Sequence, residues 1–159
     1  MFASMDIIGV LLGWGEKLLG GFRHSAKADL RIADQARLLR RQLTASFADW
    51  PHGPKTDDEL LRWAYNAARG FTVTEPAFQE LVDLRPEASR GIRRVVGTAR
   101  DDFYGAADLI GPAMRSKWIV KDGEASPAPF DGAPFRKAFA HFKRCITALD
   151  TVVAAKDAQ

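Results

Sequence analysis

Arg136 and His141 are the two residues whose types and spacing come closest to supporting catalysis. A histidine changes its charge near neutral pH and can act as a general base, while a guanidinium can hold a phosphate and stabilise the charge that develops on it. Together the two side chains would suit cleavage of a phosphodiester bond. The alternative is structural, because His141 lies next to Phe142 and can be a histidine at the edge of the core.

The spacing from Arg136 to His141, an arginine followed by four residues and a histidine, resembles the motif of the HEPN ribonuclease families. These families are all-α domains that dimerise and cleave RNA with an arginine and a histidine from each protomer. The resemblance implies an RNA-cleaving dimer with Arg136 and His141 in the site. Lys137 departs from the pattern, because a small polar residue usually follows the arginine there.

Arg90, Arg93 and Arg94 form the densest group of basic residues and could bind a phosphate or another anion. The alternative is a solvated helix face with internal ion pairs, because Asp101 and Asp102 follow closely. The single cysteine and the three histidines lack the spacing that zinc sites use. We therefore expect no metal and no cofactor.

The N-terminal segment combines an apolar helical stripe with an unusual number of glycines. The side chains that would contact a protein partner or a membrane surface are Ile8, Leu11, Leu12, Trp14, Leu18 and Phe22, with Lys17 and Arg23 beside them. Glycines inside a helix each cost about 1 kcal/mol relative to alanine, so a contact should offset them. Three interpretations remain open: an ordinary core helix, a membrane-surface helix and an oligomer contact.

Helical periodicity and start and stop signals divide the chain into five or six expected helices. The predicted helices begin near residues 4, 25, 56, 74, 85 and 135. The glycine pair Gly20-Gly21 should end the first helix, Thr74-Glu75-Pro76 should start the fourth, and Gly111-Pro112 should end the fifth. Residues 117–134 are rich in proline and glycine, and we expect an irregular loop there in preference to a hairpin.

The expected fold is therefore an all-α, single-domain bundle of five or six helices. Residues 1–22 form an N-terminal amphipathic, glycine-rich helix, and residues 23–159 form the helical bundle. A chain of 159 residues, 47% of them hydrophobic, can bury a core of its own.

Charge, cysteine content and motifs restrict the class of function. The net charge of +3 is too small to imply a dedicated nucleic-acid partner, and the lone Cys145 makes a reducing cytosol the default compartment. The sequence contains no phosphate-binding glycine loop and no nucleophile elbow. We expect a non-enzymatic, cytoplasmic helical-bundle protein that binds a protein partner or itself through the N-terminal helix. Peripheral membrane attachment and HEPN-like ribonuclease activity are the alternatives.

Overall fold

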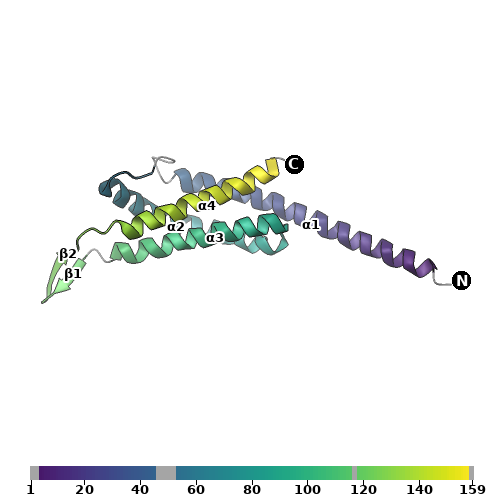
Figure 1. The fold of residues 1–159 in the computed structure, drawn as a ribbon, viewed down its shortest axis with the longest axis horizontal. Coiled ribbons are helices and arrows are strands. Elements are labelled where there is room, and N and C mark those ends of the chain that lie inside the picture. The colour runs from purple at the N-terminus through teal and green to yellow at the C-terminus, as the bar shows by residue number, and fades with distance from the viewer. Residues whose placement is uncertain (1–3, 46–52, 116–117, 158–159) are drawn as a thin grey trace.

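In the computed structural model the chain is an up-and-down bundle of long helices with one small hairpin (Figure 1). The structure describes residues 4–45, 53–115 and 118–157. The helices are α1 (Ser4–Ala45), α2 (Asp57–Leu84), α3 (Arg90–Arg115) and α4 (Ala133–Asp157), with a short 3-10 turn, η1 (Arg85–Glu87), before α3. The strands are β1 (Trp118–Lys121) and β2 (Glu124–Pro127).

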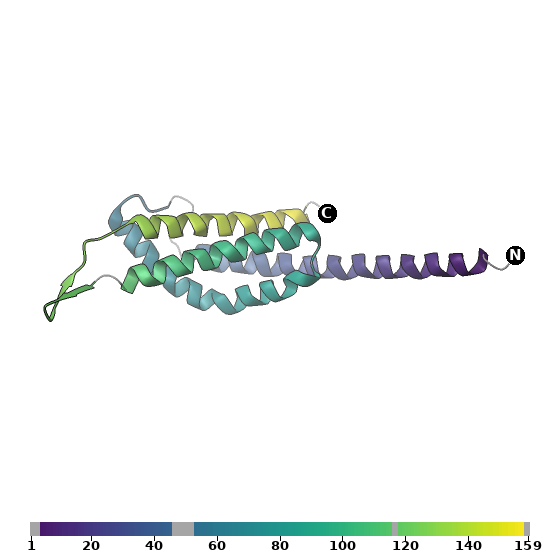
Figure 2. The same ribbon diagram turned by 60° about the horizontal axis from the view of Figure 1, so that its bottom comes forward.

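The four helices share one apolar core. α3 and α4 run antiparallel side by side, and the C-terminal part of α1 packs on α2 and α4 (Figures 1 and 2). The largest fully buried side chains are Ile32, Leu39, Leu43, Phe78, Leu81, Val96, Phe103, Ile110, Phe142, Ile146, Leu149 and Val152. The rings of Phe78 and Phe103 stack with their centroids 4.3 Å apart, which ties α2 to α3. The all-α expectation is therefore confirmed.

The expected count of five or six helices is wrong, because the described residues form four α-helices. The first difference is in α1, which runs from Ser4 to Ala45 without a break at Gly20-Gly21. Glycine lowers helix stability but does not forbid helical backbone angles, so two glycines need not end a helix. The expected end of the second helix near Trp50 lies outside the described residues.

The second difference is in α2, which continues through Pro76 instead of restarting at Thr74. The Thr74 hydroxyl is buried and donates to the carbonyl of Gly70 at 2.7 Å, so it does not cap a new helix. Phe71 and Phe78, on either side of the proline, both pack on Phe103 of α3. This packing holds α2 together across the missing hydrogen bond, and α2 curves around the core (Figure 2).

The third difference lies after α3. That helix runs one turn past Gly111-Pro112 to Arg115. The expectation of an irregular loop over 117–134 is wrong for its first half, where β1 and β2 pair antiparallel. Asp122 and Gly123 have φ angles of 53° and 82°, as a two-residue hairpin turn with an Asp-Gly sequence requires. The four residues of β2 are all exposed, so the hairpin stands apart from the core.

Candidate functional site

The most distinctive feature of the molecule is the N-terminal half of α1, which projects past the end of the bundle (Figures 1 and 2). The bundle end is marked on α1 by Asp29, whose carboxylate accepts a hydrogen bond from the backbone N–H of Ser89 at 2.9 Å. We call residues 4–24 the overhang. Its 21 helical residues correspond to about 32 Å at 1.5 Å per residue.

Within the bundle, surface ion pairs join α1 to α4. Arg37 pairs with Asp157, Arg40 pairs with Asp150, and Lys156 lies 3.4 Å from the carboxylate of Asp34. Gln35 also donates to the backbone carbonyl of Ala77 in α2 at 3.1 Å. The part of α1 from which the overhang extends thus contacts two neighbouring helices, α2 and α4.

The overhang continues the apolar seam that α1 buries in the bundle. Within the bundle, Ile32, Ala36, Leu39 and Leu43 follow the alternating spacing of four, three and four residues, and all are fully buried. The same spacing extends toward the N-terminus through Asp29, Ser25, Phe22, Leu18, Gly15, Leu11 and Ile8. A repeat of seven residues with two apolar positions is the pattern of helices that pack against other helices. Polar residues interrupt the seam only at the bundle end, at Ser25 and Asp29.

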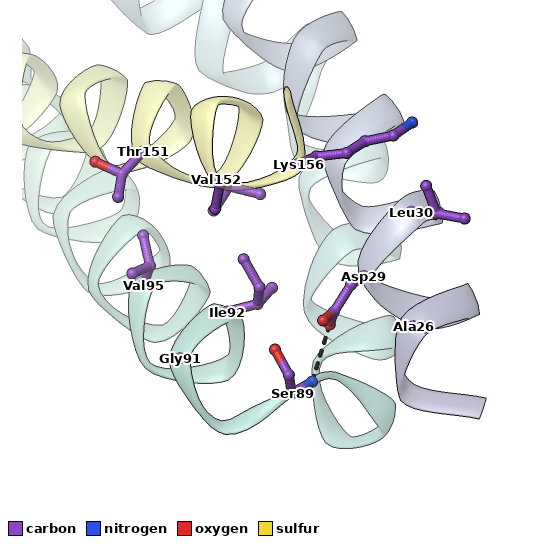
Figure 3. Close-up of a pocket in the computed structure, with 11 residues that line it drawn as sticks. Ala26, Asp29, Leu30, Ser89, Gly91, Ile92, Val95, Thr151, Val152 and Lys156 are labelled. Atoms are coloured by element: carbon purple, nitrogen blue, oxygen red, sulfur yellow. Dashed lines mark hydrogen bonds between the residues drawn. The ribbon is translucent and has the colours of Figure 1, made fainter. Parts of the chain in front are cut away.

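A pocket of about 330 Å³ lies at the bundle end, beside the base of the overhang (Figure 3). Its walls come from three helices: Ala26, Asp29 and Leu30 of α1, Gly91, Ile92 and Val95 of α3 with Ser89 before it, and Thr151, Val152, Ala155 and Lys156 of α4. Leu30 is 46% exposed. Because Asp29 is a seam position, the pocket opens on the face of α1 along which the overhang's apolar stripe runs.

The predicted contact residues all belong to the overhang. They are Ile8, Leu11, Leu12, Trp14, Lys17, Leu18, Phe22 and Arg23, and their side chains lie outside the described part of the structure. Their backbone lies in the projecting helix, away from the core of the bundle (Figure 1). The contact itself stays a prediction.

Arg136 and His141 have different partners. The Arg136 guanidinium lies at the surface and donates to the carboxylate of Asp57, at the start of α2, at 3.0 Å. His141 faces α3, where its Nδ1 lies 2.7 Å from the Asp102 carboxylate. Within one chain the structure therefore does not bring these two side chains together at one site.

His141 belongs to a polar cluster with Asp102 and Arg144 between α3 and α4. Asp102 is 7% exposed, and its Oδ1 accepts a hydrogen bond from Nε of Arg144 at 3.0 Å. Nη2 of Arg144 also lies 2.7 Å from Nδ1 of His141. The Nδ1 atom can donate to Asp102 when it carries a hydrogen, and can accept from Arg144 when it does not. A side chain at Gly105 would crowd the imidazole, since a Cβ atom there would lie 3.1 Å from Nδ1.

Asp102 and Arg144 were missed as a pair by sequence reasoning. Asp102 follows Ala99 by three residues and precedes Phe103, so it falls at the edge of the buried stripe of α3. Arg144 follows His141 by three residues, which places both on one side of α4. An acidic residue beside a buried stripe needs partners, and that signal could have pointed to this cluster. Its geometry fits a structural ion-pair network at least as well as a site of chemistry.

The three arginines predicted to bind anions lie on the exposed surface at the start of α3. Arg93 is engaged locally, because its Nη2 donates to the carbonyl of Ala88 at 3.0 Å. Its own carbonyl accepts from Nε of Arg85 at 2.9 Å. Arg90 and Arg94 are exposed, and anion binding by the group stays a prediction.

Other site chemistry is sparse in the described residues. Within 4–45, 53–115 and 118–157, no three histidine, cysteine, aspartate or glutamate side chains gather where they could hold a metal ion. Burial in the core, followed by the nearby charge of Asp102, raises the pKa of the Cys145 thiol far above its ordinary value. No helix among the described residues combines the length and the apolar character needed to cross a bilayer.

Comparison with known proteins gives no relative: no family model, no curated protein and no solved structure matches this chain.

Proposed function

We propose that this chain is a non-enzymatic interaction protein that binds protein helices through the overhang. The observation that carries the proposal is the seam, whose repeat is fully buried at Ile32, Ala36, Leu39 and Leu43. After the polar positions Asp29 and Ser25, apolar residues resume at the same spacing in a helix that projects from the bundle. A stripe that packs on helices inside the bundle is suited to pack on helices outside it.

The glycines support a contact along the overhang. Five of its 21 residues are glycine, at positions 9, 13, 15, 20 and 21. Relative to alanine they cost the helix about 5 kcal/mol in total. Burying one leucine, isoleucine or phenylalanine side chain contributes about 1.5–3 kcal/mol. The apolar positions Ile8, Leu11, Leu12, Leu18, Leu19 and Phe22 are therefore enough to offset that cost when a partner covers them.

Charge favours a protein partner over an anionic membrane. Between residues 4 and 24, Asp6 and Glu16 balance Lys17 and Arg23, so the overhang carries no net charge apart from His24. Surface helices that bind anionic lipid rely on an excess of lysine and arginine. A membrane-surface role stays the second candidate, since a projecting helix can also lie along a bilayer. We place the protein in the cytoplasm on the grounds of its single cysteine.

The test compares two substitutions on neighbouring residues of the overhang. Leu11→Gln falls on the seam, whereas Val10→Gln falls one residue away on the outer side of the helix and serves as the matched control. We expect light scattering to show that wild type and Val10→Gln form the same assembly of protein chains. Leu11→Gln should shift that equilibrium at least tenfold toward the single chain while circular dichroism shows the bundle still folded.

Vesicle flotation of the wild-type protein distinguishes the second candidate. Protein association predicts that the wild type stays with the bulk solution in the presence of anionic vesicles at low and at high salt. If the protein floats with vesicles at low salt, is released by high salt and is a single chain without lipid, the overhang is a membrane-surface helix and the proposal is wrong.

A further inference from the structure

We propose that a cavity between α2 and α3 binds a small organic ammonium ion, an amine that carries its positive charge on an apolar body. The site lies in the bundle and is independent of the overhang, so it adds a ligand to the proposed function. Three features carry the proposal: the aromatic floor of the cavity, the accepting character of its polar side chains and the negative charge at its rim.

The cavity lies where small residues leave space between the two helices. Phe71 of α2 packs edge to face on Phe103 of α3, with the ring centroids 5.0 Å apart, and this contact brings the helices together. Beside it Ala68, Ala107 and Gly111 carry too little side chain to fill the groove. The result is a cavity of about 340 Å³, which is the size of a site for a small molecule.

The floor of the cavity is apolar and aromatic. Phe71, Phe103 and Ile110 line it and are all buried in the core. Tyr104 lines the wall, with its ring edge to face on Phe103 at 5.3 Å. An apolar body placed here is removed from water, and aromatic rings also attract a cation through their negative faces. The floor therefore suits the carbon skeleton of an amine.

The polar side chains of the cavity can all accept hydrogen bonds. Glu75 of α2 and Asp108 of α3 supply carboxylates from the two walls. The Thr72 hydroxyl donates its hydrogen to the carbonyl of Ala68 at 3.1 Å, so its oxygen is left to accept. The hydroxyl of Tyr104 can accept as well. An ammonium group has hydrogens to donate and no lone pair to offer, so these acceptors match it.

Charge favours a cation over an anion as the ligand. Among the described residues that line the cavity none is basic, and neither Glu75 nor Asp108 pairs with a basic side chain described in the structure. The guanidinium of Arg115 borders the cavity, with Nη1 3.6 Å from the position that a Cβ at Gly111 would take. Arg69 lines a separate hollow on α2. Two negative charges thus face one positive charge, in a chain whose net charge is +3. A bound cation balances the excess.

Titration of the full chain with phenethylammonium tests the proposal, and 2-phenylethanol serves as the neutral probe with the same apolar body. We expect phenethylammonium to bind with a dissociation constant of about 1 mM or below and to shift the NMR signals of Phe71, Phe103 and Ile110. The neutral probe should bind at least about fivefold more weakly, because it gains nothing from the carboxylates.

Substitutions at the rim separate charge from shape. Glu75→Gln and Asp108→Asn keep the size of each side chain, and each should weaken phenethylammonium binding about three- to fivefold while binding of 2-phenylethanol is unchanged. The matched control is Asp101→Asn, which removes the same charge from an exposed position of α3 two turns away and should bind as wild type does.

Three results would overturn the site. The first is no binding of phenethylammonium at about 10 mM, or binding that leaves the signals of Phe71 and Phe103 in place. The second is equal affinity for the charged and the neutral probe. The third is a loss of affinity in Asp101→Asn as large as that in Asp108→Asn, which would mean a general effect of net charge. Circular dichroism of each variant establishes that the bundle is folded.

Discussion

The polar cluster between α3 and α4 makes a quantitative prediction about stability. Replacing Asp102 with alanine removes the carboxylate that lies 3.0 Å from Nε of Arg144 and 2.7 Å from Nδ1 of His141. A hydrogen bond to a charged group contributes about 1.5–3 kcal/mol. The side chain of Arg144 is 55% exposed, so solvent screening reduces the contribution of its hydrogen bond to about 1 kcal/mol. The cost of burying the Asp102 carboxylate offsets part of the contribution from His141.

We therefore expect Asp102→Ala to lower the free energy of unfolding by about 2 kcal/mol. For a chain of this size each kcal/mol corresponds to about 2–4 °C, so the melting temperature should fall by about 4–8 °C. Chemical denaturation gives the free energy directly. Asp101→Ala, which removes the same charge from the exposed neighbouring position, should stay within about 0.5 kcal/mol of wild type.

A double-mutant cycle then separates the cluster from the helix. Asp102→Ala and His141→Ala should be coupled by about 1 kcal/mol, because each removes a partner of the other. If the two effects add without coupling, or if Asp102→Ala destabilises no more than the Asp101 control, the cluster contributes nothing measurable and the reasoning is wrong.

Four further predictions concern single side chains. Thr56→Ala should cost about 1 kcal/mol in denaturation experiments, because its hydroxyl accepts from the N–H of Glu59 at the start of α2. Backbone N–H groups of Lys55 and Thr56 lower the pKa of Glu59. The contribution of Glu59 to stability is therefore complete above its ordinary pKa of about 4.3 and is lost as the pH falls through the lowered value. Glu59→Gln should remove this acid-induced loss from a plot of unfolding free energy against pH. Burial raises the pKa of Cys145, so as the pH rises the thiol ionises first in the unfolded chain. The free energy of unfolding should therefore fall as the pH rises above about 8.5. A thiol reagent should modify Cys145 in the folded protein no faster than the protein unfolds. Incubation with single-stranded RNA should leave it intact, and cleavage that His141→Ala abolishes without unfolding would instead support the ribonuclease alternative.

Helical periodicity was enough to predict the class of fold, because the period of an apolar stripe distinguishes a helix from a strand without any knowledge of its neighbours. Of the predicted stripes, Ile32, Ala36, Leu39 and Leu43 in α1 and Phe135, Phe142, Ile146 and Leu149 in α4 are buried in the core, while Phe139 and Val153 are only partly buried. Helix boundaries were predicted less well. Pro76 acts only on the local backbone, and packing of Phe71 and Phe78 on Phe103 outweighs that local preference. Gly20-Gly21 lowers the stability of a helix without forbidding helical backbone angles.

The candidate sites needed tertiary structure. The sequence places Arg136 five residues from His141, but α2 supplies Asp57 to one and α3 supplies Asp102 to the other. The residues of the pocket come from α1, α3 and α4, which periodicity alone cannot bring together. The sequence also could not decide whether the apolar stripe of residues 8–22 packs in the core of the bundle or contacts a partner, because both roles need the same helical spacing.

Hydrogen exchange of residues 4–24 at high and low protein concentration tests the central claim most directly. Association through the overhang predicts amide protection along this segment that is strong in concentrated protein and lost on dilution, while the amides of α3 and α4 stay protected throughout. Exchange in the overhang that is equally fast at both concentrations would show that no second copy of this chain covers it, and would contradict self-association through the overhang.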